Sequence, residues 1–302
     1  MTIFILSVSD QIYSTQRVYK EATRRGHSVS VINHLKCVIK LKNGKSEIIY
    51  KGKNIINIPD VIIPRIGASA TRHGAAIVKE FELNGTYSTA SYLGILQSQN
   101  KATTLQIVNK KNIPIPDTLF SVSPENIDEQ IALLGGAPII IKLQEGTHGA
   151  GVILADSNKS AKSIIDTLYS TNTNILLQEF IHESNSEDVR AFVVGNTVVS
   201  SMKRKGAKND FRSNIHQGGR GFKIDLSEQE TAIAIKAAHC LNLPVAGVDL
   251  IRSKRGSLLI EVNSAPGLQG IETYTKHNIG KSIIKFLEDV IYTKLQKNKG
   301  LL

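Results

Sequence analysis

The chain has 302 residues, of which 41% are hydrophobic and 21% are charged, and its formal net charge is +11. This length allows two domains or three packed lobes, and the composition is that of a soluble globular protein. Two cysteines, Cys37 and Cys240, are too few and too far apart for a disulfide framework or a zinc motif, which favours a reducing compartment. No signal-peptide pattern or long apolar run is present, so we expect a cytoplasmic protein that does not enter a membrane.

The positive charge is concentrated in two parts of the chain. Residues 1–100 carry 13 Lys and Arg against 6 Asp and Glu, residues 101–200 carry 7 against 11, and residues 201–280 carry 12 against 7. Such asymmetry suits a protein that attracts acidic substrates or an acidic macromolecule, although solubility explains the N-terminal excess equally well. Aromatic residues make up only 5%, so nucleic-acid binding would rest on charge alone.

Strand and helix patterns alternate over the first 95 residues. TIFILS is predicted to be a strand, Arg17–Arg25 a helix that Gly26 ends, and SVSVIN the next strand. A polar hairpin near Asn43–Lys53 and the strand DVIIPRIG follow, which together predict a doubly wound α/β lobe. Arg65 then lies just past a strand's carboxyl end, where such sheets bind ligands. The pattern leaves open whether Arg65 anchors a substrate or is an exposed loop arginine.

The next part of the chain begins with a predicted helix, Lys101–Lys111, so we place a domain boundary within residues 95–104. A strand TLF follows, and the helix SPENIDEQIALL is expected to start with Ser123 as its N-cap. The strand APIIIKL ends in Lys142, which is costly to bury without an anion such as phosphate unless it faces solvent.

Glycines and basic residues dominate two later segments. EGTHGAG, which contains Gly146 and Gly149, is predicted to form a flap between two strands that can close over phosphates, although glycine loops are common. The predicted strand TVVSSMKRK leads into the segment Lys203–Lys223, which holds seven Lys or Arg with only Asp210 opposed, and whose glycines predict a mobile loop. A solvated loop and a loop that meets phosphate are both compatible with this pattern.

The stretch VAGVDLIRSKRGSLLIEVNSAPG, Val245–Gly267, is predicted to form a β-hairpin. If residues 254–256 form a three-residue loop with a left-handed glycine, Asp249 lies opposite Glu261, and Asn263 shares their face. Two opposed carboxylates repel by about 4 kcal/mol at about 4 Å, so we expect a cation between them. An all-oxygen set favours Mg²⁺ or Mn²⁺ over zinc. The alternative is a polar sheet face on which both acids are hydrated.

Taken in order, Lys101, Lys142, EGTHGAG, QEFI, DVRAFVVG, KRKGAKNDFRSNIHQGG and IEVNSAPGLQGIE resemble the ATP-grasp carboxylate-amine ligases. The similarity is greatest to the RimK-type ribosomal-protein glutamate ligases, and it covers nearly the whole chain, including PRIG. It implies a pre-ATP-grasp α/β domain over residues 1–97 and an ATP-grasp domain over 98–302. That domain would comprise a small α+β lobe, about 105–177, and a larger lobe, about 178–290, that hold ATP between them.

The resemblance also implies roles for individual residues. Lysines and flap glycines would contact the ATP phosphates, a backbone segment the adenine, an aspartate the ribose, and two arginines with an asparagine the transferring phosphoryl and the acyl-phosphate. Two Mg²⁺ or Mn²⁺ ions would bind the hairpin acids and amide. The residues at the phosphates would be Lys101, Lys142, Gly146 and Gly149, and the backbone near the adenine would be that of Glu179 and Phe180. Asp188 would contact the ribose, and Arg204, Arg212 and Asn214 would lie beside the transferring phosphoryl. The metal ligands would be Asp249, Glu261 and Asn263. Ala265, where relatives often have Ser or Asn, leaves the metal ligands in place.

The implied activity joins L-glutamate to the C-terminal glutamate of the sixth small-subunit ribosomal protein, or makes poly-glutamate, through an acyl-phosphate. Implied partners are ATP, glutamate and the acceptor tail, with ribosomal RNA on the basic surface and a homo-oligomeric assembly. Related ligases act on amino-group carrier proteins, coenzyme precursors or a glutathione precursor, so these acceptors remain alternatives. A non-catalytic basic ribosome- or RNA-binding factor is another, but such a factor would not need Arg212 or the three metal ligands.

Overall fold

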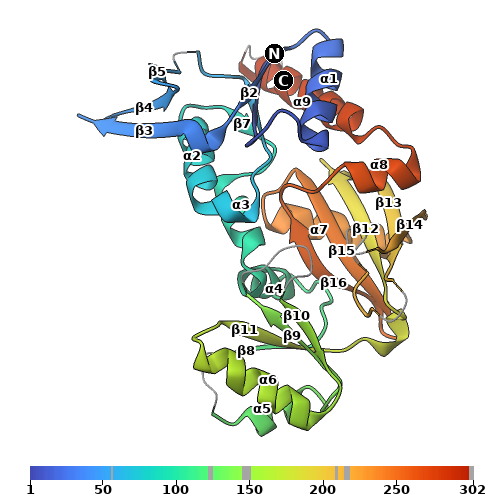
Figure 1. Cartoon of the computed structure of the whole chain (residues 1–302). Helices are drawn as coiled ribbons and strands as arrows, with labels where there is room; N and C mark the ends of the chain where they lie inside the picture. Colours follow the sequence, from blue (N-terminus) through green and yellow to red (C-terminus); the bar gives the residue numbers. More distant parts are fainter. Residues whose placement is uncertain (56, 122–124, 145–150, 208–209, 214–217, 299–302) are drawn as a thin grey trace.

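The computed structural model describes residues 1–55, 57–121, 125–144, 151–207, 210–213 and 218–298. These residues form three lobes, with the first lobe at the top of Figure 1, the large lobe at the right and the small lobe at the bottom. This arrangement confirms the predicted fold class, an α/β lobe followed by a two-lobed α+β part. No helix in the described ranges is long and apolar enough to cross a membrane.

The first lobe is built on a parallel sheet with the strand order β2-β1-β6-β7. Its strands are β1 (Thr2–Leu6), β2 (Ser28–Ile32), β6 (Val61–Pro64) and β7 (Tyr87–Ser88), and its helices are α1 (Tyr13–Arg24), α2 (Thr71–Leu83) and α3 (Tyr92–Gln99). Ile3, Ile5 and Leu6 are fully buried, as expected for a parallel strand that is covered on both faces.

A three-stranded antiparallel sheet extends from the first lobe, at the left of Figure 1. It consists of β3 (Cys37–Lys42), β4 (Lys45–Tyr50) and β5 (Lys53–Asn54). Asn43 and Gly44 join β3 to β4 with φ angles of 53° and 72°, which suit a tight Asn-Gly turn. The predicted polar hairpin is therefore confirmed, although its first strand begins earlier, at Cys37.

The small lobe is an antiparallel sheet with the order β10-β9-β11-β8 and two helices. Its elements are β8 (Thr118–Ser121), α5 (Ile127–Leu133), β9 (Ile139–Leu143), β10 (Val152–Ala155), α6 (Asn158–Ser170) and β11 (Ile175–Glu179). The predicted helix start at Ser123 is wrong, because α5 begins at Ile127 and the residue before it, Asn126, has a left-handed φ of 58°. β9 and β10 flank the predicted flap as expected, but residues 145–150 lie outside the described ranges.

The large lobe is a five-stranded antiparallel sheet with the order β14-β13-β12-β15-β16. Its strands are β12 (Glu187–Val194), β13 (Thr197–Lys205), β14 (Arg220–Lys223), β15 (Val245–Ser253) and β16 (Gly256–Asn263). Four further helices are α4 (Lys101–Lys110), α7 (Glu228–Cys240), α8 (Gln269–Thr275) and α9 (Ile279–Asn298), and short 3₁₀ helices are η1 (His34–Lys36), η2 (Ala68–Ala70) and η3 (His182–Ser184). The predicted strand TVVSSMKRK, Thr197–Lys205, is confirmed as β13, whereas the predicted loop Lys203–Lys223 is wrong at its carboxyl end, where Arg220–Lys223 forms β14.

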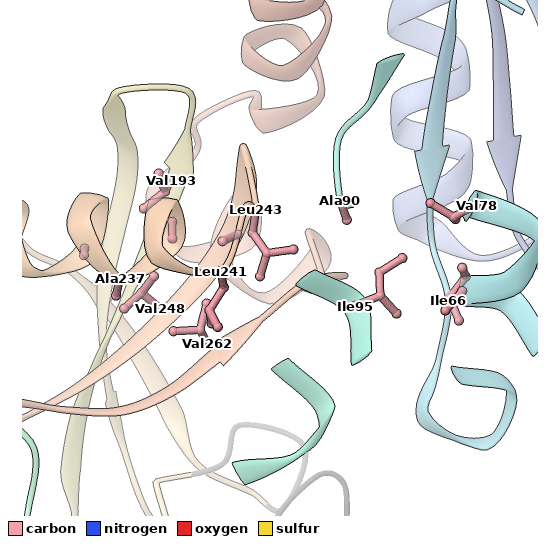
Figure 2. Close-up of a cluster of buried hydrophobic side chains, with 14 of the residues drawn as sticks. Ile66, Val78, Ala90, Ile95, Val193, Ala237, Leu241, Leu243, Val248 and Val262 are labelled. Atoms are coloured by element: carbon pink, nitrogen blue, oxygen red, sulfur yellow. The ribbon is translucent and has the colours of Figure 1, made fainter. Parts of the chain in front are cut away.

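One continuous core joins the first lobe to the large lobe. Figure 2 shows Ile66, Val78 and Ile95 of the first lobe in the same buried cluster as Leu241 and Val262 of the large lobe. A second core lies on the other face of the large sheet, where α8 and α9 pack against β1, α1 and β12. The small lobe has its own separate core. The first and large lobes are therefore packed as one unit, to which the small lobe is attached.

Candidate active site

A pocket of about 610 Å³ lies where the three lobes meet. Its wall includes Tyr13 and Gly67 from the first lobe, Gln178 from the small lobe and Gln269 from the large lobe. Ten predicted site residues also line it: Lys101, Lys142, Glu179, Phe180, Asp188, Arg204, Arg212, Asp249, Glu261 and Asn263. The other three predicted residues, Gly146, Gly149 and Asn214, lie outside the described ranges. The fold thus brings together all the described residues to which the family resemblance gives a role.

The β15–β16 hairpin pairs Asp249 with Glu261 and Gly247 with Asn263, as predicted. The predicted three-residue loop is wrong, because Ser253 pairs directly with Gly256. A register shift between Asp249 and Leu250 supplies the missing residue. The cross-strand pair therefore depends on a bulge within the hairpin rather than on its turn.

Two arginines supply positive charge at Asp249. Arg190 forms a two-pronged hydrogen-bonded pair with the carboxylate, with Nη2 at 2.6 Å from Oδ2, and Arg204 Nη2 lies 2.9 Å from the same oxygen. Burial alone would raise the pKa of Asp249, but the charges of Arg190 and Arg204 hold that pKa below its ordinary value. The cation expected from the opposed acids is therefore provided, on the Asp249 side, by side chains of β12 and β13.

Asp188 shares Arg204 with Asp249. Arg204 Nε and Nη2 each donate a hydrogen bond of 2.6 Å to the Asp188 carboxylate, and Ser213 Oγ donates another. Burial raises the pKa of Asp188 even though Arg204 opposes that shift. Both carboxylate oxygens of Asp188 therefore accept hydrogen bonds from protein groups. The ribose contact expected of Asp188 remains a prediction.

Lys142 projects from the end of β9 toward the large lobe. Its Nζ donates a 2.6 Å hydrogen bond to Gln178 Oε1. Burial lowers the pKa of Lys142 to about 8, against a smaller opposite influence of Glu261. Lys101, the first residue of α4, lowers that pKa further. Lys101 and Lys142 are two positive charges that repel each other, and a multiply charged anion bound beside both would offset this repulsion.

Glu261 and Asn263 are the residues best suited to hold a metal ion. Among the described residues, no hydrogen bond or ion pair within about 4 Å reaches the Glu261 carboxylate, and the buried Asn263 Nδ2 has no hydrogen-bond partner. The described part of the chain holds no cluster of three or more His, Cys, Asp or Glu that could bind a metal. Two carboxylates and one amide nevertheless form an oxygen donor set that fits Mg²⁺ with water or phosphate as further ligands.

The hinge between the small and large lobes is held by the tip of the β15–β16 hairpin. Glu179 accepts hydrogen bonds from the backbone N of Asp117 at 2.8 Å and from Arg255 Nη2. The Phe180 ring meets the His182 ring edge-on, with 4.9 Å between centroids. The Glu179 side chain is therefore engaged, and the adenine contact predicted for this segment concerns its backbone.

Arg212 reaches the pocket from the segment between β13 and β14. Its Nε and Nη2 each lie 3.0 Å from an oxygen of Asp210, the single acid of the basic segment. This pair raises the pKa of Arg212 and lowers that of Asp210. Asp210 thereby sets the direction of the guanidinium, which is exposed over a third of its area.

Two arginines, Arg190 and Arg65, make contacts at the site that the sequence did not predict. Arg190 lies directly opposite Asp249 on β12, and its alternation with Asp188 along one strand face was the only sequence signal. Arg65 is not an exposed loop arginine, because its Nη2 donates a 2.7 Å hydrogen bond to the carbonyl of Pro266 and its Nε is buried. Arg65 therefore supports the segment that follows Asn263.

Comparisons with known proteins agree with this geometry. Residues 98–287 match the family described as the RimK-like ATP-grasp domain, and residues 1–95 match the RimK PreATP-grasp domain. The chain is 48% identical over 288 residues to a probable alpha-L-glutamate ligase of Coxiella burnetii, with 95% of each chain covered. It is 42% identical over 300 residues to a probable alpha-L-glutamate ligase of Aliivibrio fischeri, with 99% of each covered.

A solved structure supports the fold. The ATP-grasp ligase PsnB, complexed with a minimal precursor, Mg and ADP, matches with a TM-score of 0.73 and 18% identity. The match covers 95% of this chain and 98% of that one. At 18% identity, this similarity supports the fold and nothing more.

Proposed function

Because the chain belongs to the RimK-like ATP-grasp family, whose members are ligases that form carbon–nitrogen bonds, we propose that it adds L-glutamate to the carboxyl end of a polypeptide. The acceptor we favour is the C-terminal glutamate of the sixth small-subunit ribosomal protein, as the sequence resemblance implies. The names of the relatives support the glutamate, and the precursor bound to PsnB supports a peptide as acceptor. For the same reason we divide the chain into a domain over residues 1–97 and an ATP-grasp domain over 98–302.

The proposed reaction has two steps. The acceptor carboxylate attacks the γ-phosphoryl group of ATP, which gives an acyl-phosphate and ADP. The amino group of glutamate then attacks the acyl carbon, loses a proton and expels phosphate, which gives an amide. Lys101 and Lys142 would neutralise the phosphate oxygens, and Arg204 and Arg212 would stabilise the charge that spreads over the transferring group.

Asp249, Glu261 and Asn263 would hold Mg²⁺ at the phosphates. When bound, the metal supplies Lewis-acid stabilisation of the phosphoryl oxygens. Arg190 and Arg204, which already neutralise Asp249, would keep that carboxylate ionised and directed into the pocket. The flap residues Gly146 and Gly149 would exclude water from the acyl-phosphate.

One observation carries this proposal. The chain gathers, in a single pocket lined by all three lobes, an oxygen donor set, two lysines and three arginines that come from separate parts of the sequence. Neither a solvated sheet face nor a module that only binds RNA requires this convergence. It is the composition that transfer of a phosphoryl group to a carboxylate requires.

The test is phosphate release from ATP in the presence of Mg²⁺, glutamate and a peptide that ends in glutamate, followed by mass spectrometry of the peptide. We expect phosphate release that depends on both glutamate and peptide, with mass increments of glutamyl residues on the peptide. RNA retention without formation of ADP would contradict the proposal and favour a binding factor.

A further inference from the structure

A second hollow of about 670 Å³ lies on the large lobe at the edge of its sheet. It is lined by the first half of β13, the connection from β14 to α7, the outer side of α7 and the carboxyl end of α8. The side chains that shape it are Thr197, Ser200, Lys223, Thr231, Ile235 and Lys276. None of them belongs to the active-site pocket.

The floor of this groove is an open strand edge. β13 pairs with β12 along its whole length, but β14 pairs only with Met202–Lys205. Along Thr197–Ser201, the side away from β12 has no strand partner within the described chain, and one backbone hydrogen bond reaches it there, from Ile224 N to Ser201 O at 3.5 Å. An open edge is a template for one more strand.

The edge is packed against a helix on either side. Val198 packs into the core on the α7 face, whereas Val199, at a register shift of the β12–β13 pair, packs into the core on the α8 face. Ser200 Oγ donates a 3.0 Å hydrogen bond to Thr275 Oγ1 at the end of α8. A fixed strand edge beside a helix is an arrangement that binds extended peptides by strand addition.

The charge of the rim favours an acidic peptide. Lys223 and Lys276 are exposed, and neither forms an ion pair with any described residue. By contrast, Lys203 and Lys205 on the other half of β13 share Glu187, with Nζ–O distances of 3.0 and 3.2 Å. Asp225 is the one acid that lines the described groove. Two exposed lysines without a described ion-pair partner therefore lie at the groove.

We propose that this groove binds an extended acidic segment of the acceptor polypeptide as an added β-strand along Thr197–Ser201, an inference that rests on the proposed function. The same two elements reach the active site, because Arg204 of β13 and Gln269 of α8 line the active-site pocket. Ser200 and Arg204 are about 13 Å apart along the strand. The groove can thus hold upstream residues of an acceptor whose carboxyl end is in the active site.

The test measures binding of a fluorescein-labelled peptide of about twelve residues, rich in glutamate and ending in three glutamates, by anisotropy without ATP. The double variant Lys223→Glu/Lys276→Glu should weaken binding roughly tenfold. The matched control Lys281→Glu/Lys285→Glu, which makes the same charge change on α9 outside the groove, should leave it unchanged. Equal affinity of both variants would overturn the proposal.

Strand addition is tested on the peptide, so that the fold of the protein is not disturbed. Methylation of alternate backbone nitrogens removes the main-chain donors on one edge of the peptide. One methylation register should abolish binding, and the register shifted by one residue should be tolerated. Equal tolerance of both would contradict an added strand.

Measurements of turnover and of sedimentation separate this proposal from the proposed function and from dimerisation through the same edge. If no acceptor is glutamylated but the peptide binds with the expected dependence, the groove stands and the proposed function fails. If glutamylation proceeds and Lys223→Glu/Lys276→Glu leaves the KM for a long acceptor unchanged, the groove proposal fails alone. Sedimentation that shows a dimer broken by this variant, with no peptide binding, would assign the edge to a second copy and overturn the proposal.

Discussion

At the scale of single residues, Lys142 links the protonation of the pocket to its ligand. Burial lowers its pKa to about 8 from an ordinary 10.5, so near pH 9 its amine is mostly neutral until a phosphate restores the charge. We predict that ATP binding at pH 9 takes up about one proton, measured by calorimetry in buffers of different ionisation enthalpy. Lys142→Met should bind ATP more weakly and take up none, and an unchanged uptake would contradict this role.

The lowered pKa of Lys142 also predicts how the free energy of unfolding depends on pH. The pKa of Lys142 is lower in the folded ligand-free protein than in the unfolded chain, so between about pH 8 and 10.5 the unfolded state binds more protons. The contribution of Lys142 to the free energy of unfolding therefore rises with pH across this window. Lys142→Met should remove that rise, on the order of 1 kcal/mol or more, in urea unfolding at pH 7.5 and 10. A rise of the same size in the variant would show that another group causes it.

Gly247 permits the close approach of Arg190 to Asp249. A Cβ at Gly247 would lie 2.7 Å from Pro266 Cβ and 3.3 Å from Arg190 Nη1, whereas a Cβ at Gly267 would meet nothing within 4 Å. We expect Gly247→Ala to lower the free energy of unfolding by about 1–3 kcal/mol and Gly267→Ala to change it little, as measured by urea unfolding. Equal effects of the two substitutions would contradict this packing.

Three residues that the sequence placed close together lie within one local hairpin. Local pattern predicts the β15–β16 hairpin and the shared face of Asp249, Glu261 and Asn263, whereas the bulge that sets the register of Asp249 against Glu261 has no local signal. Arg190 was missed because its place opposite Asp249 depends on the pairing of β12 with β15, strands that are far apart in the sequence. Local pattern shows that Arg190 shares a face with Asp188 but not which acid that face meets.

At the scale of elements, the β15–β16 hairpin contributes to both ends of the proposed nucleotide site. Its inner part carries the proposed metal ligands, and its tip holds Glu179 through Arg255. We predict that Arg255→Ala raises the KM for ATP several-fold and changes kcat little, because it loosens the hinge without touching the phosphates. Arg255→Lys should restore part of the loss. A fall in kcat at constant KM would contradict a positioning role.

Element boundaries show where local prediction fails. The order of strands and helices followed from apolar periodicity and from glycine and proline positions. The pairing of β14 with β13 overrode the glycine-rich and basic composition at the end of Lys203–Lys223, because a partner strand can order a polar segment. The bulge in the hairpin also has no local signal, since Leu258–Glu261 is uniformly apolar up to its acid.

At the scale of the whole molecule, Glu272 joins the first lobe to the large lobe. This α8 residue accepts hydrogen bonds from Tyr13 OH at 2.8 Å and Arg17 Nε at 2.9 Å, both on α1. Its other oxygen accepts one from Ile279 N at 2.8 Å. Three lobes were predicted from the order of the motifs, but contacts of this kind, between residues over 250 positions apart, were not readable from sequence.

We predict that Glu272→Gln lowers the free energy of unfolding by about 2–4 kcal/mol, because it removes the closer charge partner of the partly buried Arg17 and leaves Glu21, at 3.8 Å. The comparison is Lys40→Gln, which removes an exposed pair with Glu47 and should cost less than about 1 kcal/mol. Thermal unfolding of both variants is the measurement. Equal shifts in Tm would show that the contact between lobes is no stronger than a surface ion pair.

The role of the oxygen donors is tested most cleanly at Glu261. Asp249→Asn would also leave Arg190 and Arg204 without a full partner, whereas no described ion pair depends on Glu261. The decisive measurement is therefore the rate of phosphate release from ATP by Glu261→Gln, with Mg²⁺, glutamate and the peptide acceptor, at unchanged Tm. We predict a loss on the order of 100-fold or more. A correctly folded Glu261→Gln that releases phosphate at nearly the wild-type rate would contradict this account of the pocket.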